Sequence, residues 1–211
     1  MARFIAPEGY PFIGISSAVT LLGWFVSPWI AVLFFALTLF VIYFFRNPKR
    51  VIPTDSAVVL SPADGKIIEL ADMREERFLK AEARKISIFM SPMDPHVNRV
   101  PVTGTVEEVS YNKGKFLTAF HEKASLANEQ NAVVMKNEQG EKVLFIQIAG
   151  WLARRIVCYL KPGMRMAQGD IFGLIRFGSR MDVYVPMGYA IRVKMGERVK
   201  AGETVLAKKG G

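Results

Sequence analysis

The sequence offers little material for redox or metal chemistry. It contains one cysteine, Cys158, and two histidines, His96 and His121. A single cysteine forms no intramolecular disulfide and no cysteine metal cluster, so we interpret Cys158, which lies in an apolar run, as a core residue in a reducing compartment. Walker loops, zinc-ligand spacings, EF-hands and dinucleotide fingerprints are also missing from the sequence. Metal-dependent catalysis is therefore unsupported.

Charged side chains are missing from residues 10–45, a stretch too long for an ordinary core helix. One helix over this stretch would measure about 54 Å at ~1.5 Å per residue, well beyond a hydrocarbon core of about 30 Å. We therefore expect two helices broken at Ser27-Pro28. Arg3 before the stretch and Arg46, Lys49 and Arg50 after it favour a hairpin that dips into the bilayer with both ends on the cytoplasmic side. A single span over residues 24–45 is the alternative.

The formal net charge is +9, which implies an anionic partner, either nucleic acid or an anionic membrane. The interleaved basic and aromatic residues that stack bases are not evident, and the adjacent apolar segment favours the membrane. We predict a protein of the cell membrane whose catalytic domain lies on the cytoplasmic side and binds no nucleic acid.

Residues 47–211 read as a mainly β domain after a membrane-associating segment over residues 1–46. Short runs rich in Val, Ile and Phe are separated by Gly, Pro, Asn and Asp, and residues 137–140 predict a hairpin turn. Residues 72–83 and 122–129 are charged stretches that fit either helix or loop. The expected strands cover residues 58–60, 65–70, 85–90, 104–111, 132–136, 142–148, 154–160, 171–177, 182–186 and 190–193.

An internal repeat relates residues 160–170 to residues 193–203. Lys161, Gly163, Arg165 and Gly169 match Lys194, Gly196, Arg198 and Gly202. Each copy reads as a strand, a glycine turn, a basic position and a second glycine turn. Such half-motifs build barrels or sandwiches like the lipoyl- and biotinyl-carrier domains. Ser179 lies between the copies, where we expect an exposed loop suited to a reactive bond.

Three positions could carry chemistry. Glycine before serine leaves the carbonyl of Gly178 unshielded, so that the hydroxyl of Ser179 can lie against it, although a Gly-Ser pair is usually just a turn. His96 follows a strand in a proline-restricted loop beside Asp94, which suits a general base or a structural histidine equally. Asp64 precedes Gly65 and is either a turn residue or the acid that orients a histidine.

Read together, Ser61-Pro-Ala-Asp-Gly-Lys66, Ser91-Pro-Met-Asp-Pro-His96, the Gln147–Gly150 run followed by Ala153-Arg-Arg155, and Phe177-Gly-Ser-Arg180 resemble the phosphatidylserine decarboxylase family. The resemblance is to its short, single-barrel bacterial and archaeal branch, and it covers residues 46–208 in order. It implies a proenzyme that cuts itself at Gly178-Ser179 into a β chain, residues 1–178, and an α chain, residues 179–211. These chains would form a heterodimer, and higher oligomers remain open.

In that family the serine hydroxyl attacks the preceding carbonyl, and elimination and hydrolysis then leave a pyruvoyl group, here derived from Ser179. The resemblance implies that this group condenses with the amine of the phosphatidylserine headgroup and accepts the electrons released with carbon dioxide. His96 would be the processing base and the later proton donor, with Asp64 orienting it. Arg180 would hold the phosphate or carboxylate of the anionic phospholipid. Longer members carry a second histidine where this chain has Arg99.

Two other interpretations remain. The substrate could be archaetidylserine or another amino-headgroup lipid. It could also be a soluble amino acid, but a soluble substrate gives no reason to anchor the site at a bilayer. Alternatively, the chain is a non-catalytic membrane adaptor in which the repeat is only architecture. Such an adaptor would stay whole and show no carbonyl reactivity.

Overall fold

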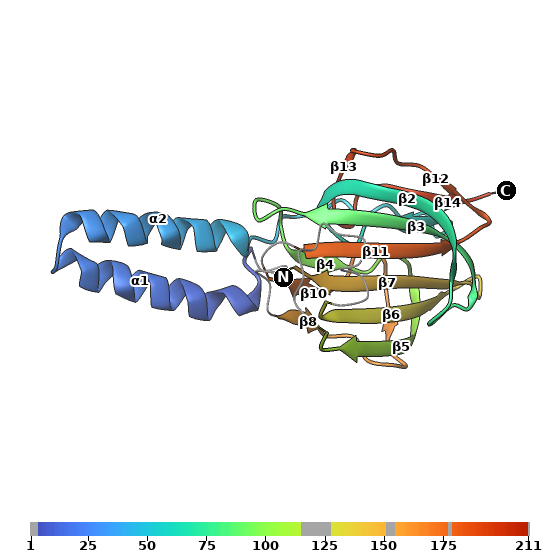
Figure 1. Cartoon of the computed structure of the whole chain (residues 1–211), viewed down its shortest axis with the longest axis horizontal. Coiled ribbons are helices and arrows are strands. Elements are labelled where there is room, and N and C mark those ends of the chain that lie inside the picture. The colour runs from blue at the N-terminus through green and yellow to red at the C-terminus, as the bar shows by residue number, and fades with distance from the viewer. Residues whose placement is uncertain (1–3, 115–127, 151–154, 177–178, 211) are drawn as a thin grey trace. The chain divides into compact units, whose positions relative to one another are not determined.

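The computed structural model describes residues 4–114, 128–150, 155–176 and 179–210. The chain divides into two compact units, Met1–Lys49 and Arg50–Gly211. The first is helical and the second consists of β-strands (Figure 1). The first unit contains a 3-10 turn, η1 (Pro7–Gly9), and two helices, α1 (Tyr10–Trp24) and α2 (Pro28–Phe44).

The two helices form an antiparallel hairpin, which confirms the expected break at Ser27-Pro28. Pro28 is the first residue of α2, where its missing N–H leaves no hydrogen bond unmade. Small or hydroxylated side chains line the seam between the helices, among them the buried Ser16, Gly23, Ala31 and Thr38. The hydroxyls of Thr20 and Thr38 lie 3.4 Å apart across it.

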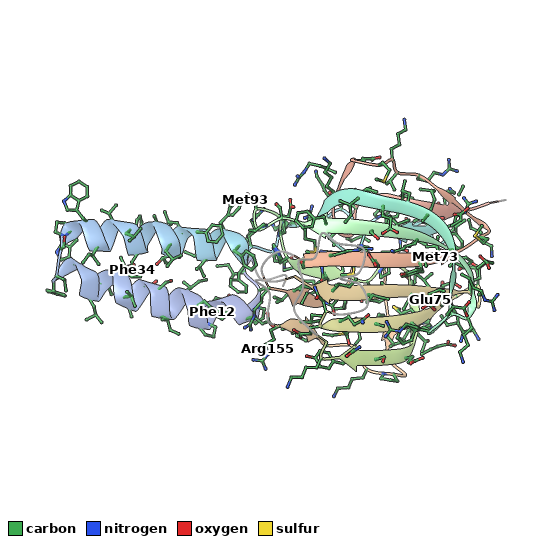
Figure 2. All side chains as sticks on the ribbon, viewed as in Figure 1. Phe12, Phe34, Met73, Glu75, Met93 and Arg155 are labelled. Atoms are coloured by element: carbon green, nitrogen blue, oxygen red, sulfur yellow. The ribbon has the colours of Figure 1, made fainter. Side chains whose placement is uncertain are left out.

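At ~1.5 Å per residue the 15 residues of α1 and the 17 of α2 extend about 22 and 26 Å. In the described part of the chain, no helix combines the length and apolar character needed to cross a membrane. The outer sides of the hairpin are nevertheless apolar, as its side chains show in Figure 2. Its large exposed side chains include Leu22, Phe25, Trp29, Leu33 and Phe35.

The second unit contains one eight-stranded antiparallel sheet in the order β13-β2-β3-β11-β7-β6-β5-β9 and two three-stranded sheets, β1-β14-β12 and β4-β10-β8. This arrangement confirms the mainly β prediction. The strands are β1 (Val58–Leu60), β2 (Gly65–Glu75), β3 (Ala81–Met90), β4 (Val97–Arg99), β5 (Gly104–Asn112), β6 (Gln130–Asn137), β7 (Lys142–Ala149), β8 (Ile156–Cys158), β9 (Arg165–Met166), β10 (Ile171–Ile175), β11 (Ser179–Pro186), β12 (Tyr189–Ile191), β13 (Arg198–Val199) and β14 (Val205–Lys209).

The large sheet is curled and buries side chains on both faces. One face, the core face, packs Met181, Val183 and Phe145 against the small sheets in the main hydrophobic cluster. The other, the second face, carries Ile146, Ile148 and Tyr184 in a smaller cluster. The tip of the β2–β3 hairpin folds over this second face, where Phe78 and Leu79 pack on the cluster. Alternation along each strand separates the two sets.

The repeat seen in the sequence forms two sets of matching turns. Gly163 and Gly196 adopt φ values of 88° and 81°, and Gly169 and Gly202 adopt 84° and 74°, a region that L side chains rarely enter. The amide of Gly163 donates to the carbonyl of Val106, and that of Gly196 donates to the carbonyl of Ile67. Each copy therefore reverses the chain against an equivalent strand, one against β5 and the other against β2.

Several local expectations need correction. Residues 72–83 form neither helix nor a long loop, because β2 continues to Glu75 and β3 begins at Ala81. Most of their charges lie on the exposed part of this hairpin, and the buried Glu75 accepts hydrogen bonds from the amides of Arg77, Phe78 and Leu79 in the turn. Cys158 is only half-buried, at the end of β8. The hairpin predicted at residues 137–140 is present, with Gly140 at φ 80° and its amide bonded to the carbonyl of Asn137.

Candidate active site

Ser179 is the first residue of β11, a central strand of the large sheet. It pairs with Met90, the last residue of β3, and with Ala149, the last residue of β7. The residue is completely buried, and its position in the alternation places it on the core face with Met181. The expected exposed loop is therefore wrong. The charged Arg180 and Asp182 are accommodated in β11 because both side chains point to the second face, where opposite charges meet them.

A chain of buried polar side chains leads to Ser179 across the core face. The Ser179 hydroxyl donates to the sulfur of Met90 over 3.3 Å, and the amide nitrogen of Asn98 lies 3.9 Å from the same sulfur. Gln147 donates to the amide oxygen of Asn98 over 2.9 Å and accepts from Asn131 over 3.1 Å. Asn98 and Gln147 are fully buried. Such a network fixes its members because each unpaired polar group would be costly.

His96 is held in the loop that directly follows β3. Its ring nitrogen Nδ1 lies 2.8 Å from the carbonyl oxygen of Asp94. A carbonyl only accepts, so in the neutral ring Nδ1 carries the proton and Nε2 is the basic nitrogen. The loop itself is fixed by Asp94, whose carboxylate accepts from the amide of Ser91 and pairs with Arg198. His96 is buried and immediately precedes β4.

The same loop lies near the end of β10. Val97, the first residue of β4, pairs with Leu174 of β10, and β10 ends at Ile175, four residues before Ser179. His96 and Ser179 therefore flank the same short connection, residues 176–178, of which Arg176 is described. The ends of β3, β7 and β10 and the starts of β4 and β11 meet here. Met93 and Arg155 lie at this end of the sheet, and Met73 and Glu75 at the other (Figure 2).

Asp64 lies in the turn before β2 and is buried. Its carboxylate accepts from Arg50 over 2.6 Å, and Arg50 also approaches Glu203. Burial raises the pKa of the Asp64 carboxyl above its ordinary value, against the partial effect of Arg50, and the negative charge of Asp94 raises it further. The carbonyl of Pro62 in the same turn accepts from the amide of Arg99, which brings the Asp64 turn next to β4. Among the contacts of the described residues, Arg50 and not His96 is the side chain bonded to Asp64.

Arg99 occupies the position of the second histidine in longer family members. Its guanidinium donates to the carbonyl of Gly169 over 2.9 Å, and its own amide donates to the carbonyl of Pro62. Burial, followed by the nearby charge of Arg50, lowers the pKa of Arg99, while Asp64 acts in the opposite direction. Arg99 thus joins the Arg50–Asp64 cluster.

Arg180 is buried on the second face, where its Nε and one terminal nitrogen are bonded to the protein's own groups. Its Nε donates to Asp182 over 2.5 Å, and one terminal nitrogen donates to Asp182, to Glu69 over 2.8 Å and to Ser87 over 2.9 Å. Lys85 adds a second cation 2.8 Å from Glu69. The pKa of Glu69 is lowered, because the bond and charge of Lys85 and the charge of Arg180 outweigh the effect of burial. Substrate binding by Arg180 remains a prediction.

Some functional candidates escaped sequence reasoning. Arg50 was assigned to the boundary after the apolar segment, and no local signal links it to Asp64, which lies 14 positions away. Asn98 lies two positions after His96, yet only the fold brings its side chain to Met90 and Gln147. Gln147 could have been found, because it is a lone amide within the apolar run of β7.

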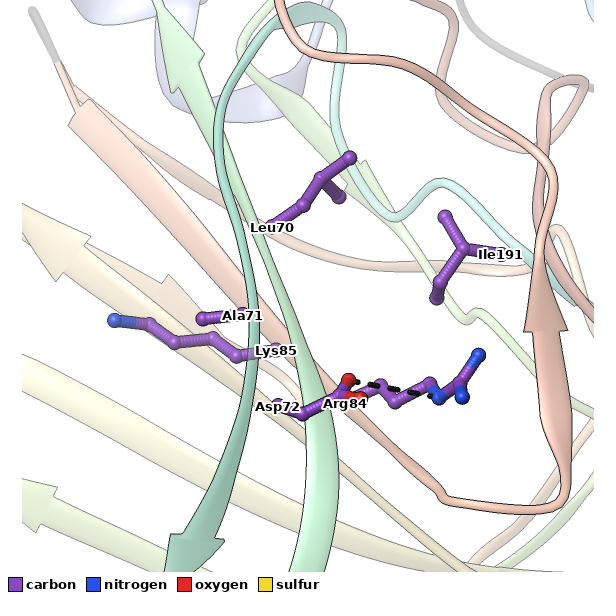
Figure 3. A pocket seen from close by; sticks show the side chains of 6 residues that line it. All are labelled: Leu70, Ala71, Asp72, Arg84, Lys85 and Ile191. Carbon is purple, nitrogen blue, oxygen red and sulfur yellow. Dashed lines mark ion pairs between the residues drawn. The ribbon is translucent and has the colours of Figure 1, made fainter.

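A separate hollow of about 350 Å³ lies on β2, β3 and β12 (Figure 3). It is lined by Leu70, Ala71, Asp72, Arg84, Lys85 and Ile191. The Asp72–Arg84 pair within it spans 3.5 Å, and both side chains are substantially exposed, so it contributes little to stability. Lys85 of β3 pairs with Tyr184 of β11, and Tyr184 lies five residues after Ser179 on that strand. This hollow is distinct from the site around Ser179.

The described residues include Ser179, His96, Asp64 and Arg180, whereas Gly178, His121 and Arg154 lie outside them. Over the described ranges, no group of three or more His, Cys, Asp and Glu side chains is placed to hold a metal ion. The residues present do fit a pyruvoyl group made from the chain itself. Ser179 is buried on the core face at a strand start, with its hydroxyl directed at an uncharged sulfur.

The fold and the site define a β-sheet protein with a buried serine at the start of a central strand and a histidine in the loop that follows the neighbouring strand. The family model for phosphatidylserine decarboxylase matches residues 37–207. The phosphatidylserine decarboxylase proenzymes of Syntrophotalea carbinolica and Geotalea uraniireducens are each 50% identical over 206 residues, covering 96% of this chain and 95% of theirs. That of Ralstonia nicotianae is 47% identical over 211 residues, with 97% and 95% covered. The chain belongs to the phosphatidylserine decarboxylase family.

Proposed function

We propose that this chain is a phosphatidylserine decarboxylase proenzyme that cleaves itself at Gly178-Ser179 and then converts phosphatidylserine to phosphatidylethanolamine and carbon dioxide. The family match carries the decarboxylase activity and the pyruvoyl group. The observation that supports the cleavage site is the position of Ser179, buried at the start of β11 beside the His96 loop. The match favours the enzyme over a non-catalytic adaptor.

In the processing step, the hydroxyl of Ser179 attacks the carbonyl carbon of Gly178 and replaces its peptide bond by an ester. Loss of the Ser179 α-proton breaks that ester, with the Gly178 carboxylate as leaving group. Water then adds, and ammonia leaves residue 179 as its keto group forms. His96 is the proposed base, since its Nδ1 is engaged by the Asp94 carbonyl and its Nε2 is the basic nitrogen.

The mature group supplies a carbonyl that accepts the electrons released with carbon dioxide. The chain's own residues prepare the site for this step. The sheet and the small sheets exclude water from Ser179, and the Asn98–Gln147–Asn131 chain holds the Met90 side chain beside it. His96 is the proposed proton donor to the product. Asp64, held by Arg50, is proposed to set the charge and orientation of the His96 loop.

We place the proposed contact with the membrane on the helical hairpin. Phe25 and Trp29 are 86% and 81% exposed at and just after the turn between the helices. Apolar side chains of this size are stabilised by transfer out of water, and such a hairpin can lie in the lipid interface without spanning it. The proposed membrane contact brings an anionic phospholipid substrate to a catalytic unit on the cytoplasmic side.

The test of cleavage is the intact mass of the purified chain with and without Ser179→Ala. The wild type is expected to give two polypeptides, residues 1–178 and 179–211, the second with a keto group in place of its amino terminus. Ser179→Ala is expected to remain one inactive polypeptide. A wild-type chain that stays whole while it decarboxylates phosphatidylserine would contradict the proposal.

A further inference from the structure

Cleavage at Gly178-Ser179 creates a mechanical problem at the start of β11. Before cleavage, residues 176–178 tie Ser179 covalently to β10. Afterwards residue 179 is a chain terminus, and terminal residues lose order unless they are tied down. Conversion to a pyruvoyl group also removes the amide N–H of residue 179, which could otherwise donate to the ladder with Met90 or Ala149. The reactive carbonyl would then be attached to the least constrained residue of the strand.

The next residue has the contacts needed to hold that terminus. Arg180 is 1% exposed, and its guanidinium bonds to Asp182 on its own strand, to Ser87 on β3 and to Glu69 on β2. One side chain thus connects three adjacent strands. The fork of Nε and a terminal nitrogen on the Asp182 carboxylate fixes the plane of the guanidinium as well as its position.

The anchor does not occupy the space needed for the reaction. Successive residues of a strand point to opposite faces. Arg180 therefore lies on the second face, while Ser179 lies on the core face, where it contacts Met90 and, through it, Asn98. An arginine whose donors are engaged on the opposite face is poorly placed to bind a headgroup beside Ser179. Its geometry suits a role in holding the strand.

We propose that Arg180 is a positioning residue, which keeps the pyruvoyl-bearing end of β11 in register after the peptide bond before it is broken. This proposal rests on the proposed cleavage at Gly178-Ser179. Arg180 acts through residue 179 and touches neither substrate nor base. Its contribution is therefore greater in the mature enzyme than in the proenzyme, where the chain is still continuous.

Lys85 provides a matched control. It is a buried cation of the same cluster, also bonded to Glu69, but it belongs to β3 and reaches β11 only through a 4.0 Å ion pair with Asp182. Arg180→Met and Lys85→Met each remove one buried positive charge and leave Glu69 with one cation. Arg180→Lys keeps the charge but cannot form the fork. Ser87→Ala removes a single acceptor of the guanidinium and keeps the test usable if Arg180→Met does not fold.

The experiment uses the full chain in detergent and follows four quantities: the fraction cleaved, the rate at which a bulky hydrazide labels the α-chain carbonyl, the unfolding temperature, and kcat and KM for phosphatidylserine. For Arg180→Met we expect cleavage to proceed, labelling to accelerate several-fold, kcat to fall by at least about tenfold and KM to stay within about twofold, because misplacement of a reacting group lowers the rate of the chemical step. Ser87→Ala is expected to shift the same quantities in the same direction by less. Arg180→Lys should recover part of kcat.

Lys85→Met is expected to lower the unfolding temperature while labelling and kcat stay within about twofold of wild type. If Lys85→Met and Arg180→Met changed the labelling rate and kcat equally, Arg180 would act only as a buried charge that stabilises the fold, and the proposal would be overturned. A rise in KM alone would assign Arg180 to substrate binding and overturn it too. If the wild type is not cut at Gly178-Ser179, the proposed function and this inference fail together, whereas normal cutting with unchanged kcat and labelling in Arg180→Met removes the inference alone.

Discussion

The most direct perturbation of the proposed membrane contact is the double substitution Phe25→Ala with Trp29→Ala. The two side chains are 86% and 81% exposed, so their removal from the hairpin forfeits almost no packing within the protein. If both insert into lipid, each contributes about 2 kcal/mol of binding by transfer out of water. Their joint loss of about 4 kcal/mol corresponds to a decrease of roughly a thousandfold in the partition coefficient.

The assay is flotation of the full chain with vesicles of phosphatidylethanolamine and phosphatidylglycerol, after dilution from detergent. The matched control is Val51→Ala with Met195→Ala, which removes two exposed apolar side chains of the β unit, 84% and 59% exposed. We expect the control to float as the wild type does, with circular dichroism confirming that both proteins keep their helices. Equal flotation of the hairpin variant and the wild type would refute the assignment of the membrane contact to this turn.

Three further predictions concern the β unit. In the uncleaved Ser179→Ala chain, the contribution of Asp64 to the free energy of unfolding should fall as pH rises from 3.8 through its raised pKa, since the folded chain binds that proton more tightly. Glu69, whose pKa is lowered, acts in the opposite direction, so the test is the difference in unfolding free energy between this chain and the same chain with Asp64→Asn, from denaturant titrations; a difference that stays constant across this range would contradict the burial argument. Gly163→Ala should cost about 1 kcal/mol for its φ alone, whereas Gly169→Ala should cost more because the added Cβ would meet Ile52 at 2.6 Å; equal unfolding free energies would count against this reading of the turns. Met181→Ala should cost about 2–5 kcal/mol and should also loosen the mature complex, so that the α chain is released at lower urea than in the wild type, as size-exclusion chromatography would show.

The broad architecture follows from local signals in the sequence. Strand-forming runs separated by Gly, Pro and Asn predicted most of the strands, and the two copies of the repeat predicted turns that the positive φ values of Gly163 and Gly196 confirm. The helix break at Ser27-Pro28 followed from length and from the position of proline. These features depend on residues within one turn or strand, where the sequence is informative.

The environment of Ser179 could not be predicted in this way. The sequence predicts an exposed loop at Ser179 and a strand only from Asp182 onward, whereas β11 begins at Ser179. The buried Arg180 is neutralised there by Asp182 and by Glu69, and Glu69 lies 111 positions earlier in the chain. Similarly, the partner of Asp64 proved to be Arg50, and the ring of His96 is bonded to a carbonyl of its own loop. Pairing across distant strands is set by the fold and leaves no trace in local composition.

The same long-range pairing would let the chain remain folded after the proposed cleavage before Ser179. The bond before Ser179 lies just outside the start of β11, so its loss removes no strand from the sheet. The α chain would keep β11 between β3 and β7, and β14 between β1 and β12, with Val183 and Leu206 in the main cluster. The interface between the two products is therefore the core of the domain. In the proposed mature enzyme, a reactive carbonyl generated there would be held by packing that existed before the cut, and only the first residue of β11 would require an additional anchor.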